Sequence, residues 1–418
     1  MKVIYLYSDD ETGWNCSHWR CHLLSNAIEA AHEENPKRFP HRAQMFFMPT
    51  AVDWDNPTVQ SKIGTGDIIV CQRNVIDQKV WDMMDYWRAL GKIVVTDLDD
   101  HYPNIPASNP AFAYWIENAL EMDPIPVERL KKGLEHSDAL ISPSHVILKD
   151  WEATVPGYFW PNYPARLDYE KLPRRLPGDP DIRYGYKMRD DKPDFVMEEL
   201  PNTAGNVYIG WGGSLSHVDS FKYSGVVEAL ARLLAERPNV YLKFCGHDER
   251  LKFLWEKLPK GKLIRQDGVD PKHWPHVVAS FDIGIAPMDM REVLTNTGKE
   301  NPGYSYDERR SWLKLVEYLC AGVPFVATDC APYKELGRFG KLVANTPDAW
   351  YAALANRLDG LGYFYAEAMK NREYALKKLT VEASADRLIQ LYVRVGEETQ
   401  VRRLGAKLPD VLYITPAA

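Results

Sequence analysis

The sequence lacks the features that would place a protein in a membrane or in an oxidising compartment. None of its apolar runs approaches the roughly 18 residues that a membrane-spanning helix needs. The apolar start of the chain is followed too soon by aspartates to be a signal peptide. Its six cysteines form no CxxC pair and lie mostly in apolar strings, which is typical of buried free thiols. These absences favour a cytoplasmic protein without integral membrane contact.

An excess of positive charge is also lacking. The chain has 51 Lys and Arg against 58 Asp and Glu, a net charge of −7. This balance argues against a protein that holds nucleic acid by bulk charge alone, although a local basic groove remains compatible with it.

Spaced metal-ligand pairs are lacking too. Cys16, His18, Cys21 and His22 lie close together, but zinc fingers separate their ligand pairs by a loop. We therefore expect this stretch to pack as a helix near a cleft, and we expect no metal.

What the chain does have is an ordinary globular composition and a repeating pattern of strands and helices. Its 418 residues, 45% hydrophobic and 26% charged, are enough for two to three domains. In the first 160 residues, short apolar runs alternate with amphipathic segments, which indicates a parallel sheet covered on both faces. Strands are expected at 2–7, 43–49, 66–72, 91–98 and 137–144, and helices at 18–34, 80–91 and 126–137.

The alternation stops in a proline-rich, locally basic stretch and then resumes. Strands are expected again at 206–213, 240–246, 281–288 and 323–329, and helices at 224–237, 311–322 and after 347. The predicted organisation is an α/β chain of two Rossmann-like, doubly wound domains with a cleft between them. The predicted parts are an N-terminal domain (1–165), a linker or insertion (166–205), a C-terminal domain (206–375) and a helical end with a tail (376–418).

The helix expected at 311–322 carries the strongest chemical signal. Ser311 can cap its start, where free N–H groups and the positive dipole end suit a phosphate. Lys314 adds a cation one turn in, and Glu317 follows on the same face, where a carboxylate could accept ribose hydroxyls. The alternative is an amphipathic helix with an ordinary Lys–Glu surface pair.

The string KLVEYLCAGVPFVAT (314–328) resembles the helix–strand signature of retaining glycosyltransferases with the GT-B fold, of the family-4 type. FDIGIAPM (281–288), YFWPNY (158–163), IGWGGSLSHVDS (209–220) and VVTDLDDHYPNIP (94–106) are similar to further motifs of that family. The last two are closest to a subset that builds surface polysaccharides and to phage-type relatives. The resemblance implies a nucleotide-sugar donor on the C-terminal domain, an acceptor mainly on the N-terminal domain, and final helices that cross back.

Residue by residue, the resemblance matches Glu317 to the ribose-binding glutamate. It matches Lys314, Arg310 and Ser311 to groups around the diphosphate. It also places Gly212, Gly213 and Ser214 in the loop close to that diphosphate, with His217 nearby. The position eight residues before Glu317, acidic in the common motif, is Arg309, with Glu308 beside it as a candidate catalytic residue.

Two N-terminal segments are further candidates. The run Asp97–Leu98–Asp99–Asp100–His101 follows an expected strand, and we predict that Asp99, Asp100 and His101 form an active-site loop. A solvated turn or a divalent metal site are the alternatives. In the first loop, Gly13 permits close backbone approach, and Arg20 could reach a phosphate or an acceptor. Arg20 could instead be an exposed helix residue.

Together these features predict a retaining glycosyltransferase of a bacterial or phage-infected cell that uses a nucleotide-diphosphate sugar, with a UDP-sugar favoured, and no obligatory cofactor. The acceptor is either a glycan, free or lipid-linked, or a hydroxymethylated base of phage DNA. A nucleotide-sugar 2-epimerase of the same fold and a non-catalytic nucleotide-binding module are the alternatives.

Overall fold

The computed structural model describes residues 1–9, 16–173, 179–189, 192–202, 205–213, 215–246, 249–292 and 305–405. Its contacts divide the chain into two compact units. The first unit comprises Met1–Asp99, Glu128–Trp160 and the chain from Ser384; the second comprises Asp100–Val127 and Pro161–Ala383. Among the described residues, no helix is both long enough and apolar enough to cross a membrane.

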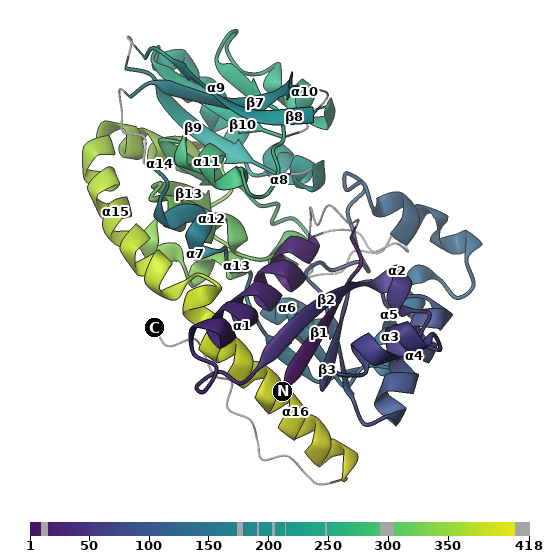
Figure 1. Cartoon of the computed structure of the whole chain (residues 1–418). Coiled ribbons are helices and arrows are strands. Elements are labelled where there is room, and N and C mark those ends of the chain that lie inside the picture. The colour runs from purple at the N-terminus through teal and green to yellow at the C-terminus, as the bar shows by residue number, and fades with distance from the viewer. Residues whose placement is uncertain are drawn as a thin grey trace. The chain divides into compact units, whose positions relative to one another are not determined.

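The first unit is built on a six-stranded parallel sheet with the order β2-β1-β3-β4-β5-β6. Figure 1 labels its first three strands, β2, β1 and β3. β3 and β4 are buried along their whole length, because helices cover both faces of a parallel sheet. The strands are β1 (Lys2–Tyr7), β2 (Arg42–Phe47), β3 (Ile68–Gln72), β4 (Ile93–Asp97), β5 (Ala139–Ser142) and β6 (Gly157–Phe159).

The last helix of the described chain, α16, belongs to this first unit and packs against α1 (Figure 1). Its Tyr392 makes an edge-on ring contact with Tyr5 of β1, and its Arg403 pairs with Asp138 at 2.8 Å. The helices are α1 (Leu23–Glu34), α2 (Met48–Ala51), α3 (Pro57–Ile63), α4 (Gln78–Ala89), α5 (Pro126–Glu135), α6 (His145–Asp150) and α16 (Ala385–Arg403), with a π-helical turn at His18–His22.

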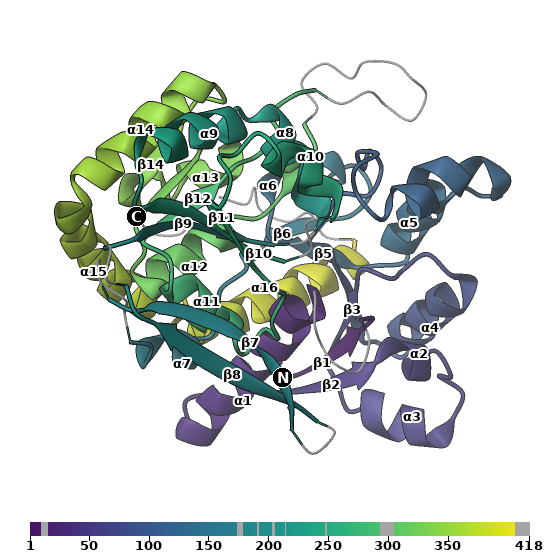
Figure 2. The same ribbon diagram turned by 90° about the horizontal axis from the view of Figure 1, so that it is seen from above.

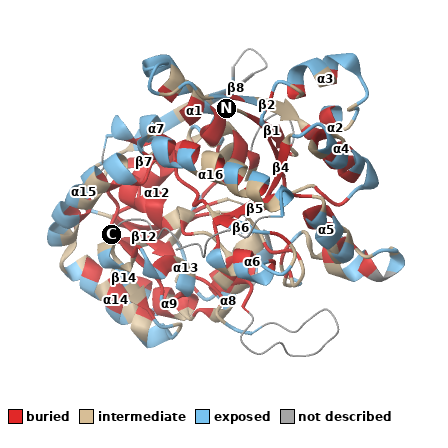
Figure 3. Cartoon of the chain, turned by 90° about the horizontal axis from the view of Figure 1, so that it is seen from below, coloured by how far each residue is buried: buried red, intermediate tan, exposed pale blue. Residues whose placement is uncertain are grey.

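The second unit repeats the plan with the order β11-β10-β9-β12-β13-β14, again parallel throughout. Its buried core lies around Trp211, Phe221 and Phe244. Figure 3 shows buried residues in red, and in this unit they include most of α12 (Leu313–Ala321). The strands are β9 (Val207–Gly212), β10 (Val240–Cys245), β11 (Leu263–Gln266), β12 (Ile283–Ala286), β13 (Phe325–Thr328) and β14 (Lys341–Val343).

The helices of the second unit alternate with these strands, as a doubly wound sheet requires. They are α7 (Arg166–Glu170), α8 (Val218–Tyr223), α9 (Val226–Glu236), α10 (Lys252–Trp255), α11 (Trp274–Ala279), α12 (Leu313–Ala321), α13 (Ala331–Lys334), α14 (Pro347–Asp359) and α15 (Leu361–Lys378). Shorter turns of helix lie at Ala113–Glu117, Asn118–Glu121, Leu215–His217, Glu249–Leu251, Asp307–Arg309, Gly337–Phe339 and Glu382–Ser384.

The segment between the sheets has more regular structure than its proline content indicates. β7 (Asp181–Arg189) and β8 (Lys192–Leu200) form a two-stranded antiparallel hairpin within the second unit (Figure 2). Lys243 of β10, which is fully buried, donates to Asp181 at 3.1 Å and ties the hairpin to the second sheet. The irregular stretch expected here is thus in part a hairpin, because alternating aromatic residues give it one apolar face.

The predicted fold class is confirmed. Both sheets are parallel and doubly wound, and the C-terminal helix returns to the first unit. The boundaries of most expected elements agree within about two residues, and the 18–34 helix is split into a π-helical turn and α1.

Candidate functional site

The strand β9 ends in a glycine turn whose backbone is approached closely by side chains. A Cβ added at Gly212 would lie 2.2 Å from the ring of Trp274. At Gly213, an added Cβ would lie 2.8 Å from the ring of Trp211 and 3.4 Å from Nζ of Lys314. Both positions therefore require glycine, because any larger residue would displace the neighbouring side chains.

Lys314, in the first turn of α12, faces this turn. Its Nζ donates to the carbonyl oxygen of Gly212 at 2.6 Å and lies 4.7 Å from the ring centroid of Trp211. Burial lowers the pKa of Lys314, while the charge of Glu317 acts in the opposite direction. The ammonium bonds to a neutral carbonyl, so an anionic ligand could replace that weaker acceptor.

Glu317 lies one turn further along α12 and is buried, with 4% of its surface exposed. Its Oε1 accepts a hydrogen bond from the indole Nε1 of Trp274 at 2.8 Å. Oε2 accepts none from the described part of the chain. Burial raises the pKa of Glu317, against the opposing effects of Lys314 and Trp274. The alternative of a Lys–Glu surface pair is therefore wrong, because this face of α12 points into the unit.

Arg310 lies just before α12 and reaches back to the segment after β9. Its Nη2 donates to Oγ of Ser216 at 2.8 Å, and its Nη1 lies 3.3 Å from Nδ1 of His217. Burial lowers the pKa of His217 well below its usual range, and the charges of Arg310 and Lys314 add to this effect. The imidazole is therefore neutral and can accept a hydrogen bond at Nδ1.

Asp307 forms an ion pair with Arg310 that helps to fix the position of the guanidinium. Its carboxylate lies 3.6 Å from the guanidinium and accepts hydrogen bonds from Oγ of Ser220 at 2.7 Å and from the backbone N–H of Asp289 at 2.6 Å. The side chain of Asp307 is 4% exposed. A buried carboxylate with three partners fixes the cation rather than competing for a ligand.

The start of α12 differs from the predicted one. The helix begins at Leu313 after Trp312, with no side-chain cap, and a short helical turn at Asp307–Arg309 precedes it. Oγ of Ser311 accepts from Nδ2 of Asn162 at 3.2 Å and makes only a long contact, 3.5 Å, with the N–H of Leu313. Ser311 is therefore not the cap of this helix, although it lies beside the helix start.

The structure thus brings together most of the candidate residues of the second sheet at the end of β9 and the start of α12. These are Gly212, Gly213, His217, Arg310, Ser311, Lys314 and Glu317. Glu308 is half-buried in the preceding turn, and the adjacent Arg309 is buried and donates to the carbonyl of Ser305 at 2.9 Å. Gly13 and Ser214 lie outside the described residues.

Arg20 is placed differently from either expectation. Its side chain is completely buried, and two of its nitrogens donate to the two carboxylate oxygens of Asp97, each at 2.7 Å. A third nitrogen donates to the carbonyl of Trp160 at 2.8 Å. Because the guanidinium of Arg20 is already bonded to a buried carboxylate, it cannot reach a phosphate or an acceptor. Arg20 is therefore no longer a candidate ligand-binding residue.

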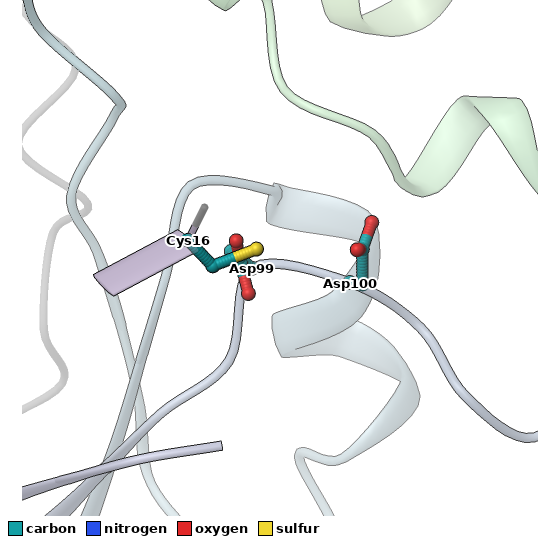
Figure 4. A group of neighbouring side chains, drawn as sticks. All are labelled: Cys16, Asp99 and Asp100. Carbon is teal, nitrogen blue, oxygen red and sulfur yellow. The ribbon is translucent and has the colours of Figure 1, made fainter. Parts of the chain in front are cut away.

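Asp99 follows β4 beside Cys16, and Figure 4 shows the thiol directed at its carboxylate. The ligand atoms of Cys16, Asp99 and Asp100 lie within 4.8 Å of one another. Burial raises the pKa of Asp99, whereas the thiol of Cys16 donates a hydrogen bond that lowers it. The same atoms are close enough to hold a metal ion, and chelation tests our expectation that the protein needs none.

His101, in the second unit, is 5% exposed. Burial, with a contribution from Arg309, lowers the pKa of His101 to about 3. Its imidazole is therefore neutral at physiological pH. Sequence reasoning missed Trp274, which contacts both Gly212 and Glu317. The local signal is an aromatic residue directly before a proline in the first turn of α11.

Comparison with known proteins identifies the fold of the chain. No protein-family model matches the chain, and no curated protein matches its sequence. Solved structures do match. Sucrose-phosphate synthase from Thermosynechococcus elongatus gives a TM-score of 0.59 at 13% identity, over 95% of this chain and 99% of that one.

HepE from Anabaena, solved in complex with UDP-glucose, gives a TM-score of 0.56 at 13% identity, over 96% of this chain and 99% of that one. The N-terminal domain of trehalose-6-phosphate phosphatase from Candida albicans gives 0.51 at 10% identity, over 94% and 96%. At such low identity these matches show the fold, which is GT-B.

Proposed function

We propose that the protein is a retaining glycosyltransferase that moves a sugar from a nucleotide-diphosphate sugar, by preference a UDP-sugar, to a hydroxyl group. The observation that carries the proposal is the pair of cations at the start of α12, Arg310 and Lys314, beside a buried carboxylate, Glu317, and two obligate glycines. Supporting evidence is the shared fold, which HepE uses to hold UDP-glucose.

In this proposal the diphosphate lies against the glycine turn. Lys314 exchanges the Gly212 carbonyl for a phosphate oxygen, and the neutral His217 leaves Arg310 as the second cation. Glu317 accepts a ribose hydroxyl with Oε2. Because the cations are held in place before the substrate arrives, they stabilise the charge that grows on the departing diphosphate.

The reaction proceeds on one face of the sugar. The bond between the anomeric carbon and the diphosphate oxygen breaks, and its electron pair stays on the diphosphate. The acceptor oxygen forms the new bond from the same face, and its proton passes to a diphosphate oxygen. No protein nucleophile is needed, so the chain contributes positioning and charge stabilisation.

We assign the acidic loop to the sugar and the acceptor. Asp99 and Asp100 offer carboxylate oxygens to hydroxyl groups, and the neutral His101 offers one donor and one acceptor. Glu308 completes the set of proposed catalytic residues, together with Lys314. Gly13 and Ser214 stay as proposals for the donor loops.

The acceptor class has two candidates, a glycan and a hydroxymethylated base of DNA. A base inside a duplex must be flipped out of the stack to be reached, and DNA binding by phosphate contacts would weaken steeply with salt. Retention of supercoiled plasmid at low salt, lost by about 0.3 M, would favour DNA; no retention at low salt would favour a glycan.

A panel of nucleoside diphosphates tests the donor assignment. UDP, ADP, GDP and dTDP are added to the full chain, and the melting temperature is measured; a ligand that binds only the folded state raises it. We expect UDP to give the largest rise. The matching sugar nucleotide is then incubated with each acceptor class, and transfer is followed by mass spectrometry. Turnover of the nucleotide sugar without any acceptor would instead support an epimerase.

A further inference from the structure

Trp274 connects three elements of the second unit at the proposed nucleotide site. It opens α11 just before Pro275, and its ring lies so close to Gly212 of β9 that no side chain fits there. Its indole N–H donates to Oε1 of Glu317 on α12 at 2.8 Å. One side chain therefore fixes the distance between the glycine turn and the buried carboxylate.

The hairpin β7–β8 holds the residues just before Trp274. The ring of Phe195 stacks on His273 at 3.6 Å with an interplanar angle of 2°. The hydroxyl of Tyr186 accepts the backbone N–H of Asp270 at 2.8 Å and lies 3.2 Å from Nδ1 of His273. The loop that leads into α11 is thus packed against the hairpin.

The hydrogen bond to Trp274 divides the roles of the two carboxylate oxygens. Oε1 is occupied by the indole, while Oε2 accepts no hydrogen bond from the described residues. A carboxylate on a helix side chain could otherwise rotate about its terminal bond. With Oε1 fixed, Oε2 has one direction in which to accept a hydroxyl.

We propose that Trp274 is the positioning residue for Glu317: it orients Oε2 toward a ribose hydroxyl of the nucleotide, and the β7–β8 hairpin supports it through His273. This inference rests on the proposed function, because it presumes that Glu317 receives a ribose. The inference also gives the β7–β8 hairpin a role in binding, although the composition of this segment indicates only a linker or an insertion.

The test replaces the hydrogen bond and keeps the ring. Trp274→Phe removes the indole N–H, and the affinities of wild type and variant for UDP and for 2′,3′-dideoxy-UDP are measured by calorimetry. We expect UDP to bind on the order of tenfold more weakly to the variant, with little change for the dideoxy analogue. Trp350→Phe is the matched control, because the indole N–H of Trp350 is buried and has no hydrogen-bond partner among the residues that the structure describes.

An equal loss for both ligands would make Trp274 a merely structural residue, and no loss for either would remove it from the site. Both results overturn the proposal while leaving the binding of UDP by wild type intact. If wild type binds none of the nucleoside diphosphates, the proposed function fails instead, and the contact between Trp274 and Glu317 is then tested without ligand.

That measurement uses the indole N–H signals of protein labelled with ¹⁵N-tryptophan. One signal should shift in Glu317→Gln and should titrate in wild type with the carboxyl group, whose pKa is raised by burial. The titratable and charged groups around Glu317 are Lys314, Tyr318 and Cys320 of α12 and Tyr169 of α7. Lys314 titrates on the alkaline side, and His273 and His276, which flank Trp274 and have their pKa values lowered by burial, titrate on the acidic side. The signal of Trp274 is therefore the one that both titrates and shifts in Glu317→Gln. If none of the indole N–H signals responds to Glu317→Gln or to pH, the proposal is overturned. This result is decisive even if Trp274→Phe fails to fold.

Discussion

Each unit has a cation and a carboxylate near the carboxyl end of its sheet, but the two charges are paired directly in only one of these two arrangements. In the first unit, Arg20 and Asp97 are both fully buried and satisfy each other through two hydrogen bonds of 2.7 Å. In the second, Lys314 bonds to a backbone carbonyl and Glu317 to an indole, so neither charge is paired directly with the other.

The difference between the two arrangements lies in pairing more than in burial, because Glu317 is buried too. A bidentate Arg–carboxylate pair that excludes water stabilises one arrangement of the chain and has no group left for a substrate. In our proposal, the two opposite charges of the second unit, each bonded to a neutral partner, bind a ligand that carries both a phosphate and a hydroxyl group. Four experiments test this contrast between the two units.

The largest effect is expected from breaking the buried ion pair between Arg20 and Asp97. Arg20→Met leaves the carboxylate of Asp97 buried without its cation, which should cost about 3–5 kcal/mol of unfolding free energy. Denaturant titration measures it. Arg42→Met is the control, since Arg42 makes a similar fork with Glu29 at the surface and its loss should change stability little. If Arg20→Met lost no more unfolding free energy than Arg42→Met, the contrast between the buried pair and a surface pair would be contradicted.

Removing the cation of Lys314 in the second unit should slow the reaction. Lys314→Ala is expected to lower kcat on the order of 10²-fold, and more than it raises KM, because charge grows on the diphosphate as the bond breaks. Lys314→Arg should recover only part, since a planar fork does not reproduce a point charge. Lys257→Ala, at an exposed pair with Glu228, is the control. A kcat within about twofold of wild type would remove Lys314 from the reaction.

The smallest effect is expected from chelation. Transfer activity should survive EDTA, because in our proposal Lys314 and Arg310 stabilise the diphosphate and the acidic loop holds no obligatory metal. Steady-state rates with and without EDTA test this expectation. Loss of activity with chelator and recovery with Mn²⁺ or Mg²⁺ would show that the loop of Asp99 and Asp100 holds a metal after all.

The fold was largely predictable because it depends on local patterns. The short apolar runs and the amphipathic stretches between them predicted both parallel sheets, and the strand 2–7 agrees with β1 at both ends. The hairpin was missed because prolines around it suggested irregular structure. Its signal was the alternation of Tyr184, Tyr186 and Met188, which gives β7 one apolar face.

The site was less predictable because it depends on contacts between distant residues. Arg20 was misplaced because its partner, Asp97, lies 77 positions away, and no local pattern reveals that a helix residue will meet it. Trp274 was missed for the same reason, since Glu317 lies 43 positions further on. The α12 residues were found because one helix carries them and the helical period sets which of them share a face.

The central claim is that the second unit, through Glu317, holds the ribose of a nucleoside diphosphate. Calorimetric titration of UDP into wild type, Glu317→Ala and a folded Arg20 variant, Arg20→Lys, tests it most directly. The account predicts that Glu317→Ala loses about 1.5–3 kcal/mol of binding free energy, the contribution of a hydrogen bond to a charged group, while Arg20→Lys binds as wild type does. Unchanged affinity in a folded Glu317→Ala protein, or a loss in Arg20→Lys alone, would contradict it.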